Sequence, residues 1–145
     1  MEFFRLISAD PRRLREVVLN LVDNAVKYTP PSGHVRLDAR EHDGVVELRV
    51  SDTGVGIPDG VGERIFEPFY ALGRTQRGEA SSGLGLALTK RLVEAQGGTL
   101  RFSNNGDIGT TFTVTFEVAD GTAARRGRGS APSRRRARAQ DAERR

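Results

Sequence analysis

One stretch near the start of the chain, residues 11–28, constrains the fold more than any other. Apolar residues recur at helical spacing from Leu14 to Tyr28, which predicts an amphipathic helix with one buried side. Asp10 is a typical N-cap, Pro11 suits the first helical turn, and the following "TPPSG" ends the helix. Such a helix gains most of its stability from packing, so the rest of the chain must provide an apolar surface for it.

Alternation of apolar and polar residues predicts a sheet that can provide this surface. Residues 34–40 and 45–52 alternate on either side of "EHDG", which indicates an antiparallel hairpin. Residues 99–105 and 110–118 alternate in the same way, and "FFRLIS" at residues 3–8 is a further candidate strand. We therefore expect four or five strands.

A second long helix fits residues 84–96, and Gly97 and Gly98 end it. Between the hairpin and this helix, residues 53–82 are rich in glycine and polar residues, with a short helical piece at 62–70. These elements predict an α+β two-layer sandwich, in which a mixed, mostly antiparallel sheet is covered on one face by helices.

Charge divides the chain into one folded domain, residues 1–120, and a tail, residues 121–145. The domain has a net charge of −3, whereas the tail, with nine arginines and two acidic residues, has +7. The tail has no apolar periodicity, so we expect it to be disordered. An arginine-rich tail can bind nucleic acid or an anionic membrane surface, but a solvated extension without a dedicated partner is the favoured interpretation.

The composition excludes several classes of protein. The chain has no cysteine, which excludes disulfides and thiolate metal sites. It has no run of about 18 apolar residues that could span a membrane, and the start, "MEFFRLISAD", lacks the pattern of a secretion signal. We expect a soluble, intracellular protein.

The first helix also carries an unusual polar stripe. Glu16, Asn20, Asn24 and Lys27 fall within roughly 80° of one another on a helical wheel, opposite the apolar side. Asparagine is a mediocre helix former, so two of them one turn apart need an explanation. A solvated polar face would explain either one alone. Together, the carboxylate, the two amides and the ammonium group could hold a hydrated Mg²⁺ ion and phosphate groups.

Two glycine-containing motifs add candidates for a ligand site. Asp52 follows a strand and precedes Gly54 and Gly56, so its carboxylate could accept a hydrogen bond from an amine such as adenine N6. Gly83 and Gly85 begin the second helix, where free N–H groups favour an anion. Taken alone, each motif is better explained by a turn or by ordinary capping. A P-loop and a dinucleotide fingerprint are both excluded, because leucine follows Gly83 and "GLGLAL" lacks the third glycine.

Five segments, in this order, resemble the catalytic, ATP-binding domain of two-component sensor histidine kinases: "REVVLNLVDNAVKYTP", "DTGVGI", "ERIFEPFY", "SSGLGLALTK" and "GTTFTV". The resemblance covers about residues 10–118. It implies the ATPase fold that is shared with DNA gyrase, a heat-shock chaperone and mismatch-repair proteins. It also implies ATP and Mg²⁺ as ligands, a flexible ATP lid at about residues 70–82, and transfer of the γ-phosphoryl group to a histidine.

The resemblance gives a role to each matching residue. Asn20 and Asn24 would orient Mg²⁺ and the phosphates, and Asp52 would accept a hydrogen bond from the adenine amine. Phe66 and Phe69 would anchor the lid, and Phe69 would also line the nucleotide pocket. The other residues implied near the nucleotide are Lys27, Tyr28, Gly54, Gly56, Gly83 and Gly85, with Ile57, Leu84 and Leu86 as apolar walls and Thr111 or Thr110 closing the pocket. Core packing is an equally good explanation for the three apolar residues.

The implied catalytic residues are Glu16 and Asn20. Glu16 stands where the family often has an acidic residue that assists proton removal from the attacking imidazole. The alternative for Glu16 is an ordinary surface charge, because exposed helical glutamates usually have no other role.

Two departures from the family pattern favour nucleotide binding over fast turnover. Ser81 stands where a glycine is usual, and Ala71 stands where many relatives have arginine. Arg74 or Arg77 could replace that positive charge only if the lid folds them inward.

The two histidines, His34 and His42, are expected to be surface residues, with His42 at the hairpin tip. The resemblance therefore implies a phosphoacceptor histidine on a separate dimeric helical hairpin, and a response regulator as a further partner. The chain is then expected to be a cytoplasmic catalytic piece: part of a longer kinase that could carry a membrane anchor, a split gene product, or a module that works in trans. Two alternatives stay open, a protein-serine kinase of the anti-sigma-factor kind and a nucleotide-dependent binding module without catalysis.

Overall fold

The computed structural model describes residues 9–70, 83–106 and 108–118. Its elements are α2 (Pro11–Tyr28), β1 (Val35–His42), β2 (Val45–Asp52), the 3₁₀ helix η1 (Gly62–Phe66), α3 (Gly85–Ala95), β3 (Thr99–Asn104) and β4 (Thr110–Glu117). The candidate strand at residues 3–8, nearly all of the expected lid and the expected disordered tail lie outside the described residues. None of the described helices has the length and apolar character needed to cross a membrane.

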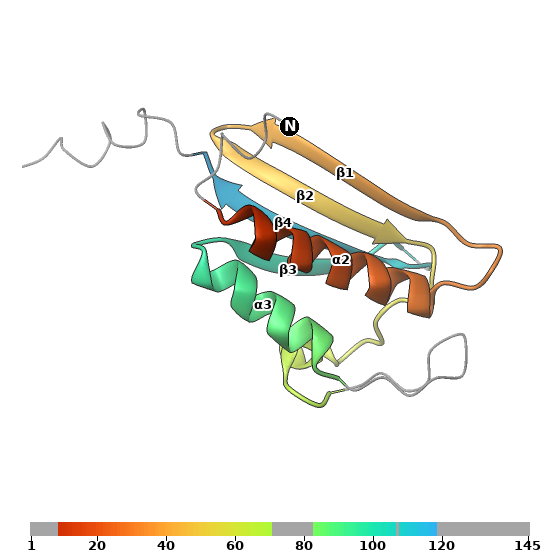
Figure 1. Ribbon diagram of the computed structural model, residues 1–145. Coiled ribbons are helices and arrows are strands. Elements are labelled where there is room, and N and C mark those ends of the chain that lie inside the picture. Colours follow the sequence, from red (N-terminus) through yellow and green to blue (C-terminus); the bar gives the residue numbers. More distant parts are fainter. Residues whose placement is uncertain (1–8, 71–82, 107, 119–145) are drawn as a thin grey trace, which may run out of the picture.

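The described strands form one sheet in the order β1-β2-β4-β3, and each neighbouring pair is antiparallel. Helices α2 and α3 lie side by side on one face of this sheet (Figure 1). The predicted α+β two-layer fold and the predicted hairpin are therefore confirmed. At the hairpin turn, Asp43 and Gly44 have φ values of 51° and 76°, the conformation of the two-residue turns that Asp-Gly favours.

Helix α2 begins and packs as its sequence predicts. The side chain of Asp10 accepts a hydrogen bond of 2.9 Å from the backbone N–H of Arg12, which caps the helix. The buried residues of the helix are Leu14, Val17, Leu21 and Ala25, and they share one core with strand residues such as Val50 and Phe112. Because each fully buried aliphatic side chain contributes about 1.5–3 kcal/mol, this stripe fixes α2 along the sheet.

The sheet brings distant polar residues together at one of its ends. Strand β2 ends at Asp52, β4 begins at Thr110, and the pairing of Ser51 with Thr111 places these two ends side by side. The C-terminal end of α2 reaches the same place, since a Cβ atom on Gly54 would overlap the backbone carbonyl of Tyr28. Helix and sheet therefore both contribute to this end of the molecule.

Candidate functional site

A cavity lies between the C-terminal half of α2, the end of the sheet and the start of α3. Its empty volume is about 870 Å³, a figure that includes open solvent at its mouth. Its lining residues are Asn20, Asp23, Asn24, Lys27, Tyr28, Asp52, Gly56, Ile57, Ile65, Tyr70, Gly83, Gly85, Leu86, Thr110 and Phe112. Polar groups from several segments therefore converge on one cavity whose walls are partly apolar.

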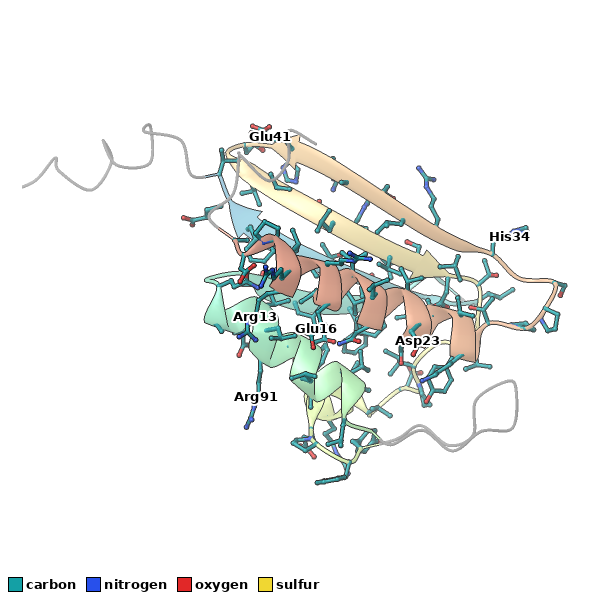
Figure 2. All side chains as sticks on the ribbon, in the orientation of Figure 1. Arg13, Glu16, Asp23, His34, Glu41 and Arg91 are labelled. Atoms are coloured by element: carbon teal, nitrogen blue, oxygen red, sulfur yellow. The ribbon has the colours of Figure 1, made fainter. Side chains whose placement is uncertain are left out.

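The α2 wall contains most of the predicted polar stripe. Asn20 and Asn24 are half-buried and line the cavity. Lys27 lines it too, and its ammonium group forms an ion pair of 2.9 Å with Asp23. Asp23 also lines the cavity, although it was not predicted from the sequence. Its position four residues before Lys27 places it on the same stripe of the helix. Glu16 is exposed and is not among the described residues of the wall. Figure 2 shows Glu16 and Asp23 along the side of α2 that is nearer to α3 in this view.

The carboxyl group of Asp52 is buried at the cavity wall, with only 6% of the residue exposed. Its Oδ1 accepts hydrogen bonds from the backbone N–H groups of Gly54 at 2.9 Å and Thr110 at 3.2 Å. Within the part of the chain that the structure describes, Oδ2 has no such donor. Burial raises the pKa of this carboxyl above its ordinary value, and the two backbone bonds oppose that shift. One oxygen is thus held by the protein and the other can accept from a ligand.

The predicted residues in the loop after β2 have two roles: some line the cavity and one supports its wall. Gly56, with a φ of 72°, and the buried Ile57 line the cavity. Gly54 is not among the described lining residues, and it holds Asp52 through its N–H while packing against the backbone of Tyr28. A side chain at Gly54 would push the end of α2 away from the sheet.

Thr110, and not Thr111, stands in the cavity wall. The hydroxyl of Thr111 shares a hydrogen bond of 2.8 Å with Ser51 and donates one of 2.7 Å to Asn105. Successive residues of a strand point to opposite faces, so only one of the two threonines can face the cavity. The expectation that Thr111 closes the pocket is corrected to Thr110.

The aromatic residues from the end of η1 to Tyr70 differ in where they lie: one is in the core, one is exposed to solvent and one lines the cavity. Phe66 is buried, and its ring centroid lies 6.1 Å from that of Phe102. Phe69 has a φ of 65° and is 76% exposed, so its ring turns away from the wall. Tyr70 lines the cavity instead, and the guanidinium group of Arg64 lies 5.5 Å from its ring centroid. The structure therefore places Tyr70, and not the predicted Phe69, in the wall.

The start of α3 supplies the opposite wall through Gly83, Gly85 and Leu86. Gly83 has a φ of 71°, and its carbonyl accepts a hydrogen bond of 3.0 Å from the N–H of Phe69. A Cβ atom on Gly83 would lie only 2.6 Å from the backbone of Phe69. Leu84 is 44% exposed and is not among the described lining residues. The two departures from the family pattern, Ala71 and Ser81, lie outside the described residues, as do the candidate replacements Arg74 and Arg77.

Both histidines lie away from the described wall of the cavity. His34 is exposed before β1 and points away from the helices (Figure 2). His42 ends β1, and its ring nitrogens lie 3.2 Å from a carboxylate oxygen of Glu47 and 3.6 Å from one of Asp43. These surface positions agree with the sequence expectation.

The oxygen atoms that α2 offers to the cavity could bind a cation only if a phosphate-containing ligand supplied further oxygens. Among the described residues, no three His, Cys, Asp or Glu side chains are grouped so that they could hold a metal ion. The amide oxygens of Asn20 and Asn24 and the carboxylate of Asp23 are donors of the kind that Mg²⁺ accepts, and this ion usually completes its shell with water and substrate phosphates. The site therefore suits Mg²⁺ that arrives with a polyphosphate.

Comparison with known proteins shows the family to which the chain is similar. A model of the family described as histidine kinase-, DNA gyrase B- and HSP90-like ATPases matches residues 9–120. The chain is 46% identical over 111 residues to the circadian input-output histidine kinase CikA of Synechococcus elongatus, covering 75% of this chain and 15% of CikA. It is 39% identical over 112 residues to the histidine protein kinase DivJ of Caulobacter vibrioides, covering 77% and 19%. The chain thus spans less than a fifth of the length of each relative.

Solved structures agree with the sequence comparison. The mycobacterial sensor histidine kinase MprB has a TM-score of 0.67 and 34% identity, covering 76% of this chain and 73% of that one. Full-length ShkA in complex with AMPPNP has a TM-score of 0.67 and 38% identity, covering 78% and 23%. The likeness holds for fold and sequence together.

Proposed function

Because the chain belongs to the family of histidine kinase-, DNA gyrase B- and HSP90-like ATPases, we propose that it is the ATP-binding catalytic domain of a sensor histidine kinase. The observation that carries this proposal is that one cavity is lined both by the buried carboxylate of Asp52 and by the amides of Asn20 and Asn24. Two relatives that are named histidine kinases, CikA and DivJ, support this class of activity.

Asp52 recognises the base. Its Oδ2 accepts a hydrogen bond from the exocyclic amine of adenine, while the backbone bonds to Oδ1 fix the orientation of the carboxylate. Guanine presents a carbonyl oxygen at the corresponding ring position, and a carboxylate would repel it. A buried polar group that is paired with one base and unpaired with the other gives strong selectivity.

The asparagines and the start of α3 hold the phosphates. Asn20 and Asn24 can donate from their amide nitrogens to phosphate oxygens and offer their amide oxygens to Mg²⁺. The first N–H groups of α3, near Gly83 and Gly85, favour an anion because they have no partner within the helix. When bound, Mg²⁺ would neutralise part of the phosphate charge.

The reaction is the transfer of a phosphoryl group to an imidazole nitrogen. A bond forms between that nitrogen and the γ-phosphorus while the bond from this phosphorus to the β–γ bridging oxygen breaks, so ADP leaves. The imidazole loses a proton in this step. Glu16, exposed one turn before Asn20, is the residue that we assign as the acceptor of this proton.

The nucleophile comes from outside this chain. Neither His34 nor His42 is in the described cavity wall, and in-line attack requires near-contact with the γ-phosphate. The partners are therefore a dimeric helical hairpin with a phosphoacceptor histidine, in trans or on another part of the parent kinase, and a response regulator downstream. The domain would act in the cytoplasm.

The test is to incubate the chain with γ-labelled ATP and Mg²⁺, with and without a phosphoacceptor hairpin from a histidine kinase. The isolated chain is expected to bind ATP without labelling itself. The hairpin is expected to acquire label that acid removes and base does not, as a phosphoramidate does. A hairpin variant that lacks the histidine is the matched control.

Other outcomes would favour the alternatives. Acid-stable label would indicate a serine kinase, and ATP binding without label on the hairpin would indicate a binding module. Label on the isolated chain that disappears in His34→Ala or His42→Ala would contradict the external acceptor.

A further inference from the structure

Asn104, at the end of β3, makes a two-point contact with the loop that follows β2. Its Nδ2 donates to the carbonyl of Ile57 at 2.8 Å, and its Oδ1 accepts from the N–H of Ile57 at 3.0 Å. The side-chain amide therefore pairs with both backbone groups of one residue, as a residue of a neighbouring strand would. The two residues are 47 positions apart in the sequence.

The turn between β3 and β4, which follows Asn104, also contacts the other end of this loop. The Nδ2 atom of Asn105 donates to the backbone carbonyl of Asp52 at 3.3 Å. Gly109, with a φ of 85°, approaches that carbonyl so closely that a Cβ atom would overlap it. A Cβ atom on Gly56 would lie 3.4 Å from Oδ1 of Asn104. The turn between β3 and β4 thus holds the loop at Asp52 and at Ile57.

The held loop forms part of the cavity. Gly56 and Ile57 line it, yet residues 53–57 belong to no helix or strand whose hydrogen bonds would fix them. A wall that is already ordered binds more tightly, because the ligand does not have to order it. We propose that Asn104 is a positioning residue that fixes this loop against the nucleobase and so sets the selectivity for adenine. This inference rests on the proposed function.

Asn104 acts through Ile57 and not through the core. It is exposed at the edge of the sheet, it is not among the described residues that line the cavity, and it does not belong to the core cluster. The asparagines that face the phosphates are on α2, a different element. Loss of the Asn104 contacts should therefore change recognition of the base and leave recognition of the phosphates intact.

The experiment compares ATP and GTP affinities, by calorimetry with Mg²⁺, in the parent chain and two variants. Asn104→Ala removes both bonds, whereas Asn104→Asp keeps the shape but sets an oxygen against the Ile57 carbonyl. Each variant is expected to lose up to about tenfold in ATP affinity, because the nucleotide must then order a loop that one to two net hydrogen bonds hold in the parent. GTP affinity is expected to change by less than about twofold. Ser103→Ala, an exposed neighbour on β3, is the matched control and should bind both nucleotides as the parent does.

Amide exchange in the nucleotide-free chain supplies an independent readout. The N–H of Ile57 is expected to exchange faster in both variants and at the parent rate in Ser103→Ala. A parent that fails to bind ATP would overturn the proposed function and the adenine role with it. A parent that binds ATP, with an unchanged ATP-to-GTP ratio in both variants, would overturn this inference alone. Equal losses for the two nucleotides, or unfolding of both variants, would show a structural role and would also overturn it.

Discussion

Asp52 is both a buried carboxyl group and the proposed recognition group for adenine. Its Oδ1 is already bonded to two backbone N–H groups, so an asparagine can keep both bonds through its own oxygen. Its amide nitrogen would then face the ligand where Oδ2 stands, opposite another donor. Asp52→Asn therefore separates the cost of burying a charge from the benefit of recognising adenine.

Asp52→Asn is expected to weaken ATP binding by about tenfold or more, since a donor clash replaces an attraction of about 1–3 kcal/mol. It should not lower the unfolding temperature of the nucleotide-free chain at neutral pH. Calorimetric titration and thermal unfolding measure the two effects. Unchanged ATP affinity would remove Asp52 from the site.

The pH dependence of this variant has a definite sign. Because burial raises the pKa of Asp52 in the folded chain, the folded state binds the proton more tightly than the unfolded state. The stabilisation is present below the unfolded pKa of about 4 and is lost as the pH rises through the folded pKa. The unfolding temperature of Asp52→Asn should therefore rise relative to the parent between acidic and neutral pH, and a relative fall would contradict the assignment.

Glu16 tests chemistry separately from binding. Because it is exposed and outside the described wall, Glu16→Gln is expected to leave ATP affinity unchanged. Removal of a general base typically costs 10²–10⁴-fold in rate, so phosphoryl transfer to an added hairpin should fall by about that factor. Quenched-flow measurement of transfer from labelled ATP gives this rate. An unaltered rate would show that Glu16 is an ordinary surface charge.

Single residues are also where sequence reasoning was least reliable. Phe69 was expected in the wall, but a positive φ, which is unusual for phenylalanine, turns it outward and leaves Tyr70 in its place. Thr110 and Thr111 could be separated only by knowing which face of β4 meets the cavity. Asn104 gave no local signal, because its partner is distant in sequence.

At the scale of elements, α2 combines a structural side with a binding side. Its cap, its bounds and its buried stripe were predictable because they depend on local chemistry and helical period. The hairpin of β1 and β2 was predictable for the same reason. The position of β4 between β2 and β3 joins residues far apart in sequence, and so it was not predicted.

The two sides of α2 respond differently to mutation. Asn24→Ala is expected to leave helix stability equal or slightly higher, since alanine has the better propensity, and to weaken Mg²⁺-dependent ATP binding by about tenfold. Arg13→Ala, an exposed position on the same helix (Figure 2), is the control and should bind normally. Binding of ATP and Mg²⁺ by Asn24→Ala at the parent level would mean that the stripe is only a solvated face.

At the scale of the whole molecule, the described part of the chain ends with a residue of the core. The last described residue, Val118, is buried and donates its N–H to the carbonyl of Gly44 at 2.9 Å. Residues 121–145 follow it with nine arginines and little apolar content other than alanine. Such a composition offers little surface to bury against the domain.

Deletion of residues 121–145 is therefore expected to change the unfolding temperature and the ATP affinity little. Differential scanning calorimetry of the truncated and full chains, with calorimetric titration of ATP, measures both quantities. A drop of several degrees on truncation would show that the tail contacts the folded domain.

The most direct test of ATP binding in this cavity is a crystal structure of the chain with Mg²⁺ and a non-hydrolysable ATP analogue. The adenine amine is predicted to lie within about 2.8–3.2 Å of Oδ2 of Asp52. The phosphates should lie against Asn20, Asn24 and the first N–H groups of α3. A nucleotide bound outside the cavity, or inside it with its phosphates at Asp52, would contradict the assignment of this site.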